Sequence, residues 1–151
     1  SQLSGEYEEK LAAKGLQLVV TSPEENVYIY ADGRLLWRVF DNLMNNICKY
    51  AQENTRVYVS ASVHVEKVQI SFKNISRYPL NISSEELMER FVRGDASRNT
   101  EGSGLGLSIA RSLVDLQKGK FELVVDGDLF KAIVTFDRYY DDASPETAEN
   151  S

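Results

Sequence analysis

Two neighbouring segments alternate apolar and polar residues, and this pattern restricts the fold more than any other feature of the sequence. In the first segment the odd positions are apolar: Val57, Val59, Ala61, Val63 and Val65. The even positions carry Tyr58, Ser60, Ser62 and His64. The second segment continues the pattern at Val68, Ile70 and Phe72. A period of two is typical of strands with one buried face, so we expect a sheet that is covered on one side.

The remaining segments predict helices that cover this sheet. Over residues 32–51 apolar side chains recur every three or four positions, which predicts a helix with Asp32 as its N-cap. Further helices are expected at 3–14, 85–91 and 104–117, and further strands at 16–20, 27–30, 120–125 and 130–136. The strands at 16–20 and 27–30 are expected to form a hairpin or edge pair, and the last two a hairpin around residues 126–128. The fold class is therefore α+β, a two-layer α/β sandwich.

Composition excludes several classes of protein. Lys and Arg total 17 against 23 Asp and Glu, a net charge of −6, which argues against an electrostatic nucleic-acid footprint. No apolar run approaches the roughly 20 residues that span a bilayer. The single cysteine, Cys48, forms no internal disulfide, so a cytoplasmic setting and an inert thiol are expected. The start at Ser1 without Met suggests a fragment.

One amide interrupts the apolar stripe of the helix at 32–51. At about 100° per residue Asn46 falls between Leu35 and Val39, with Asn42 and Lys49 at the edge of the stripe. The opposite, solvated side carries Arg38, Asp41, Asn45 and Gln52. A buried amide needs a partner: either Asn46 caps a neighbouring backbone group, or the two amides and Lys49 face a common ligand. Amide oxygens suit Mg²⁺, and a lysine suits phosphate.

Three alternate glycines precede the helix at 104–117, at Gly102, Gly104 and Gly106. Glycine is unfavourable inside a helix, but bare N–H groups at a helix start form a cradle for anions. A flexible hinge explains the glycines equally well. Together with the amides, and with Arg93 and Arg98 on a polar, mobile loop at 92–102, they predict a site for a nucleoside triphosphate and Mg²⁺.

These segments also resemble a known family. LWRVFDNLMNNICKYA resembles the N box, RFVRGDASRN the F box and start of the ATP lid, and GSGLGLSIARSLVDLQKGKFEL the second glycine box of the ATP-binding catalytic domain of bacterial two-component sensor histidine kinases. The resemblance runs from Leu16 to Phe136 and implies the Bergerat (GHKL) fold, with a mixed sheet against three helices. It implies ATP and Mg²⁺ as cofactors.

By position, the resemblance assigns roles to individual residues. Asn46 and Asn42 would hold Mg²⁺, and Asn42 and Arg93 would be catalytic, Arg93 lying near the triphosphate or at the contact with the acceptor domain. Residues expected to contact the nucleotide are Asn42, Asn46, Lys49, Tyr50, Asn74, Ser76, Arg98, Gly102, Ser103, Gly104, Leu105, Gly106 and Leu107. The loop at 92–102 is expected to become ordered when nucleotide binds.

The first glycine box departs from the family pattern. Most members have Asp-x-Gly-x-Gly, which binds adenine, whereas this chain has Asn74 at the Asp position and Ser76 at the first Gly. An amide oxygen still accepts a hydrogen bond from the adenine amino group, but without charge, so weaker adenine binding is expected. Complete loss of ATP binding is the other interpretation.

The resemblance implies an enzyme that transfers the γ-phosphoryl group of ATP to a histidine on a separate dimerisation domain. His64, the single histidine, lies on the polar side of a predicted strand and is expected to be a surface residue. The expected partners are that domain and, through the full-length kinase, a response regulator; nucleic acid is not expected, nor direct membrane contact, although the parent protein would be an integral membrane sensor. The expected division is a linker helix from the dimerisation domain at 1–15, the catalytic domain at 16–138 and a disordered tail at 139–151.

Two alternatives remain open. A degenerate domain that binds nucleotide weakly or not at all would serve as a regulatory interaction module, and the altered adenine box favours it. An ATPase or serine kinase of the same superfold is the other. The ATPases place a catalytic Glu four residues before the metal Asn. This chain has Asn42 at that position, which speaks against activation of a water molecule for hydrolysis.

Overall fold

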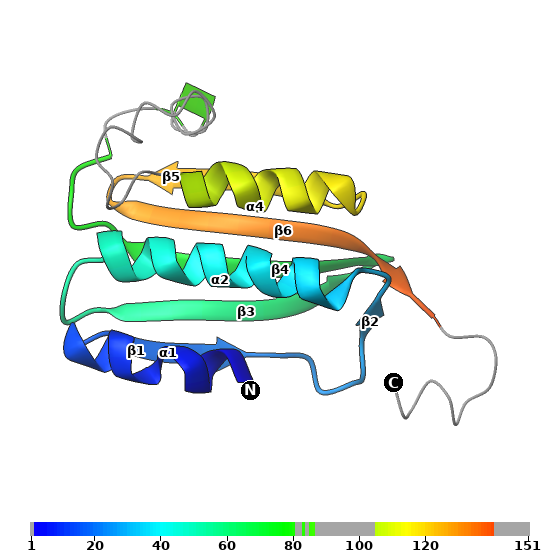
Figure 1. The fold of residues 1–151 in the computed structure, drawn as a ribbon, viewed down its shortest axis with the longest axis horizontal. Coiled ribbons are helices and arrows are strands. Elements are labelled where there is room, and N and C mark those ends of the chain that lie inside the picture. Colours follow the sequence, from blue (N-terminus) through cyan, green and yellow to red (C-terminus); the bar gives the residue numbers. More distant parts are fainter. Residues whose placement is uncertain (1, 81–82, 84, 87–104, 141–151) are drawn as a thin grey trace.

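The chain folds as a two-layer sandwich, with helices side by side on one face of a mixed sheet (Figure 1). This computed structural model describes residues 2–80, 83, 85–86 and 105–140. The helices are α1 (Gln2–Ala13), α2 (Gly33–Tyr50) and α4 (Leu105–Leu116). The strands are β1 (Gln17–Thr21), β2 (Tyr28–Ile29), β3 (Arg56–His64), β4 (Lys67–Ile75), β5 (Lys120–Asp126) and β6 (Leu129–Tyr139). The α+β class is confirmed.

Strand order within the described residues is β1-β3-β4-β6-β2, with β5 also paired to β6. The β1–β3 pair is parallel, and the others are antiparallel. The sheet is therefore mixed, as the sequence resemblance implied. The expected hairpin at residues 126–128 is present, with Asp126 opposite Leu129 and Gly127 at φ +63°.

The expected pairing of the first two strands is wrong. β1 lies beside β3, whereas β2 is two residues long and lies beside the end of β6, where Tyr28 faces Tyr139. Alternation reports which face of a strand is apolar but not which strand is its neighbour. Val65 was also misplaced: it has φ +58° in the turn after β3 and is 89% exposed.

The core lies between α2, α4 and the covered face of the sheet. Asp32 caps α2 as expected, because its carboxylate accepts hydrogen bonds from the backbone N–H groups of Arg34 (2.8 Å) and Leu35 (3.3 Å). The largest fully buried side chains of the core are Phe72, Leu43, Met44, Ile47, Leu107, Val39, Val57, Val114 and Val134. Each buried aliphatic side chain of this size contributes about 1.5–3 kcal/mol of transfer free energy.

Helix α1 belongs to this packed body. Tyr7 and Leu11 are each 2% exposed and join the core cluster. No helix among the residues that the structure describes is long and apolar enough to span a membrane. The expected helix at 85–91 falls mostly outside the described residues, and the loop at 92–102 and the tail beyond Tyr140 fall entirely outside them. The expected boundary between a linker helix at 1–15 and a catalytic domain at 16–138 stays a prediction.

Candidate functional site

Helix α2 presents Asn42 and Asn46 one turn apart on a single flank. Both side chains are half-buried, and Lys49, nearly one turn further, is exposed. Neither amide has a hydrogen-bond partner among the described residues. Asn46 therefore does not cap a neighbouring backbone group within the described part of the chain. The two amides remain available to a ligand.

The first turn of α4 lies against this flank. A Cβ added at Gly106 would be 3.7 Å from the Cβ and 3.8 Å from the Oδ1 of Asn42, which is ordinary contact distance. The structure thus places Gly106 beside the amide helix, whereas the rest of the glycine-rich segment lies outside the described residues. The side chain of Leu107 is fully buried in the core. Leu105 begins α4; Arg93, Arg98, Gly102, Ser103 and Gly104 lie outside the described residues.

The end of β4 places two buried polar side chains on the covered face of the sheet. Asn74 is 2% exposed, and its Oδ1 has no hydrogen-bond partner in the described structure. Ser76 is 8% exposed, but its hydroxyl donates to the Tyr78 carbonyl (2.7 Å) and accepts from the Tyr78 N–H (3.1 Å). A buried acceptor without a partner costs about 1–3 kcal/mol, so Asn74 is suited to a ligand that supplies a donor.

Backbone hydrogen bonds fasten the end of α2 to the end of β4. The Arg77 N–H donates to the Tyr50 carbonyl (2.8 Å), and the Gln52 N–H donates to the Ile75 carbonyl (2.7 Å). The Ser76 N–H in turn donates to the Asp128 carbonyl (2.7 Å). These bonds hold the Asn74 end of β4 beside the Lys49 and Tyr50 end of α2. The predicted base-binding and metal-binding residues are therefore parts of one connected frame.

Burial changes the acidity of two groups near this frame. It raises the pKa of the Tyr50 phenol, and the nearby Tyr78 phenol adds to the effect. Burial also raises the pKa of the Cys48 thiol, although the ammonium groups of Lys10 and Lys14 lower it by a smaller amount. A thiol with a raised pKa is a poor nucleophile, which agrees with the expected inert role of Cys48. Tyr78 lies two residues after the variant box and is 54% exposed, and no pattern in the sequence marked it as part of the site.

The opposite flank of α2 is covered by α1, which corrects one expectation. Asp41 and Asn45, expected on a solvated side, are half-buried, whereas Arg38 and Gln52 are exposed. The Tyr7 hydroxyl donates to the Asp41 carboxylate, which also lies within 3.5 Å of the Asn45 Nδ2. The polar composition of α1 concealed this contact in the sequence.

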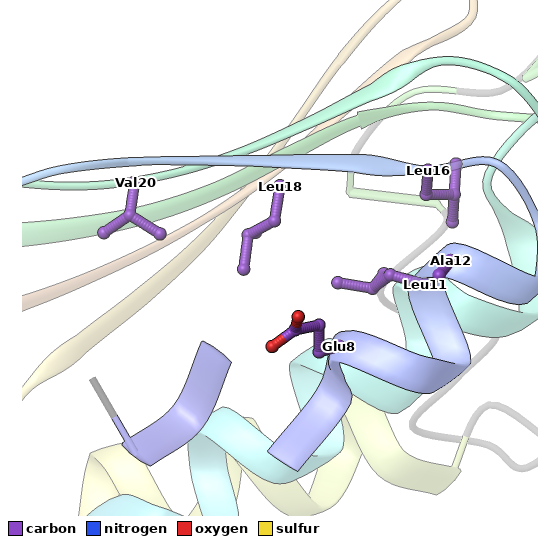
Figure 2. Close-up of a pocket in the computed structure, with 6 residues that line it drawn as sticks. All are labelled: Glu8, Leu11, Ala12, Leu16, Leu18 and Val20. Atoms are coloured by element: carbon purple, nitrogen blue, oxygen red, sulfur yellow. The ribbon is translucent and has the colours of Figure 1, made fainter. Parts of the chain in front are cut away.

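Two of the hollows lined by described residues lie away from the amide flank. One, of about 410 Å³, separates α1 from the edge strand β1, and Figure 2 shows Leu18 and Val20 pointing from the strand toward the helix. The other, of about 500 Å³, adjoins Tyr58 and Ile75 on the open face of the sheet. His64 is exposed at the end of β3 and hydrogen-bonds the Ser62 hydroxyl (2.9 Å) through Nε2. It is a surface strand residue, as expected.

The side chains present fit a magnesium nucleotide. Among the described residues, no group of three or more His, Cys, Asp and Glu side chains could hold a metal ion. Amide oxygens and phosphate are ligands that Mg²⁺ accepts while it keeps several waters. The two α2 amides, which have no hydrogen-bond partner in the described part of the chain, would supply oxygens of this kind, and the exposed Lys49 would meet phosphate.

Comparisons with known proteins agree with this geometry. Residues 31–144 match the family model described as histidine kinase-, DNA gyrase B-, and HSP90-like ATPase. The chain is 32% identical over 115 residues to the sensor protein VanS of Enterococcus faecium, an alignment that covers 75% of this chain and 29% of VanS. It is 30% identical over 118 residues to the signal transduction histidine-protein kinase BaeS of Escherichia coli, covering 77% of this chain and 25% of BaeS. The chain thus spans less than a third of these relatives' length.

A solved structure shows the same fold. The catalytic domain of histidine kinase ThkA superposes with a TM-score of 0.77 at 24% identity, covering 90% of this chain and 88% of that one. The strand order, the amide helix and the family match lead to one assignment. The chain belongs to the histidine kinase-, DNA gyrase B- and HSP90-like ATPases, and it is the catalytic ATPase domain of a sensor histidine kinase.

Proposed function

We propose that this domain binds Mg·ATP on the α4-facing flank of α2 and delivers the γ-phosphoryl group to a histidine on a dimerisation domain. The observation that carries the proposal is the pair of amides Asn42 and Asn46, which have no hydrogen-bond partner among the described residues, with Gly106 beside the first of them. Asn46 and Asn42 hold the metal ion, and Lys49 meets phosphate as a point charge. A bound Mg²⁺ neutralises charge on the phosphates.

Two further residues border the nucleotide in this proposal. The Asn74 amide oxygen accepts a hydrogen bond from the adenine amino group, and the Tyr50 ring borders the base. Arg93, Arg98, Leu105 and residues 102–104 keep the roles that the family resemblance implies. Leu107 would reach the nucleotide only through its backbone, because its side chain is fully buried in the core. Catalysis then consists of positioning and charge stabilisation, because phosphoryl transfer needs little covalent chemistry from the protein.

The wider context of the domain is also a proposal. A structure of ThkA contains the response regulator protein TrrA, which supports a response regulator as the partner of the full-length kinase. We propose that the parent is a membrane sensor that carries this domain in the cytoplasm, where ATP is available. The residues before about position 16 would join the domain to its dimerisation domain.

Calorimetry with a non-hydrolysable ATP analogue, with and without Mg²⁺, tests the nucleotide site. We expect Asn46→Ala to weaken binding in Mg²⁺ by about tenfold or more, equivalent to about 1.4 kcal/mol. Asn45→Ala is the matched control, because Asn45 lies on the other flank of α2, near Asp41. Equal binding by the parent and Asn46→Ala would contradict the metal role. Absence of binding by the parent would favour the regulatory module instead.

A further inference from the structure

The buried side chain of Asn74 is an amide at the place where the proposed function puts the nucleotide base. Asn74 pairs with Phe130 across the β4–β6 ladder and lies on the covered face of the sheet. It is 2% exposed, and its Oδ1 has no partner among the described residues. A buried polar atom that the protein leaves unpaired is costly unless a ligand completes it.

No hydrogen bond among the described residues fixes the orientation of the Asn74 amide. The neighbouring Ser76 hydroxyl is engaged with the Tyr78 backbone at both its donor and its acceptor side. Lys73 is the preceding residue, but its ammonium lies 4.9 Å from the Tyr58 ring centroid on the open face of the sheet. No contact that fixes the orientation of the amide is therefore present in the described part of the chain.

An amide and a carboxylate read a purine differently. An ionised carboxylate only accepts hydrogen bonds, whereas an amide has one accepting oxygen and two donating N–H groups. Adenine presents an amino donor at C6 and an acceptor at N1. A 6-oxopurine presents the reverse, an acceptor at C6 and an N–H donor at N1. A carboxylate facing the C6 oxygen would place two acceptors together, whereas a rotated amide complements either base.

We infer that Asn74 makes this site accept 6-oxopurine nucleoside triphosphates alongside ATP. The inference rests on the proposed nucleotide site and concerns which base that site admits. Buried groups that a ligand leaves unpaired produce strong discrimination, and a group that pairs with both bases removes that penalty. Inosine triphosphate is the appropriate probe, because hypoxanthine differs from adenine only at the C6 and N1 edge.

The test compares calorimetric affinities for ATP and inosine triphosphate, both in Mg²⁺, for the parent chain and two variants. Asn74→Asp supplies the acceptor-only group, and Lys73→Gln is the control. Both substitutions lower the net charge by one, at adjacent positions, but Lys73 points to the other face of the sheet. We expect the parent and Lys73→Gln to bind the two nucleotides within about tenfold of each other, and Asn74→Asp to favour ATP by at least about tenfold more.

Each outcome decides between the two proposals. Discrimination by the parent that equals that of Asn74→Asp would overturn the inference and leave the ATP site intact. Failure of the parent to bind either nucleotide would overturn the proposed function itself, and the inference with it. If Asn74→Asp does not fold, Asn74→Ala replaces it: similar losses for both nucleotides support the inference, and a loss for ATP alone overturns it.

Discussion

The two flanks of α2 carry similar polar residues that differ in their hydrogen bonding. On the flank that faces α1, the Asp41 carboxylate accepts from the buried Tyr7 hydroxyl, and the Lys14 ammonium donates to the Cys48 carbonyl. On the flank that faces α4, Asn42 and Asn46 find no hydrogen-bond partner among the described residues. Residues 41 and 42 are neighbours in sequence, but within the described part of the chain the side chain of one is hydrogen-bonded and that of the other is not. Polar groups that the fold satisfies stabilise it, whereas unsatisfied ones mark the site.

The largest expected difference between the flanks is in stability. Tyr7→Phe removes the hydroxyl that pairs with the Asp41 carboxylate and should lower the free energy of unfolding by about 1.5–3 kcal/mol, the range for hydrogen bonds to charged groups. Urea unfolding of the parent and of Tyr7→Phe measures this difference in free energy. Tyr30→Phe, at a residue that is 81% exposed, is the control and should change nothing. Asn42→Ala should weaken nucleotide binding with a much smaller loss of stability; the reverse ranking would break the comparison.

The next prediction is that one substitution at the α4 flank changes stability and nucleotide affinity in opposite directions. Gly106→Ala should raise the free energy of unfolding by up to about 1 kcal/mol, because alanine favours a helix and the new Cβ has ordinary contact distances. The same methyl group would lie beside the Asn42 amide, so nucleotide affinity should fall. Thermal unfolding and calorimetry on one variant measure both changes. Stability and affinity that rise together would show that Gly106 serves no ligand.

Gly119 provides the contrast at the other end of α4. A Cβ there would lie 2.6 Å from the Cε1 of Phe136 and 2.9 Å from the Cγ1 of Val114, so the core must shift. Gly119→Ala should therefore destabilise the fold, in the direction opposite to Gly106→Ala, by a strain cost of about 1 kcal/mol or more. The free energy of unfolding of both variants, measured under the same conditions, tests whether only Gly119 is required by the packing of the core.

The smallest expected effect concerns pH at the end of α2. The pKa of Tyr50 in the folded chain lies above its ordinary value of 10.0, so the folded state holds this proton more tightly than the unfolded state. The resulting contribution is complete below pH 10 and is lost as pH rises through the folded pKa. Stability should therefore fall as pH rises above about 10, and less steeply in Tyr50→Phe. Parallel curves for the two proteins would contradict this.

Local structure was predictable because periodicity reports which side of an element is apolar. The pattern of Val68, Ile70 and Phe72 extends by two to Asn74, so its burial on the covered face follows from the same alternation. The neighbour of β1 was not predictable, and neither was the contact between Tyr7 and Asp41. Both depend on which distant segments meet, and 34 residues separate that hydroxyl from its acceptor.

The candidate site was predictable in part for a related reason. Asn46 interrupts an apolar stripe, which a sequence shows directly, whereas the difference between Asp41 and Asn42 depends on which helix covers each flank. The contact of Asn42 with Gly106 joins segments that lie 64 positions apart in the numbering, as 106 − 42 gives. Helix periodicity alone does not predict this contact, because it reports the faces of one helix and not which distant segment packs against them.

The hydrogen bonds that fasten β4 to α2 have an evolutionary consequence. They run between backbone atoms of Tyr50 and Arg77 and of Gln52 and Ile75, so they do not depend on which side chains stand at Asn74 and Ser76. A frame built this way tolerates exchange of the residue that meets the base while the surrounding main chain keeps its position. A change in the preferred nucleotide would then need a single codon substitution and no rearrangement of these backbone bonds.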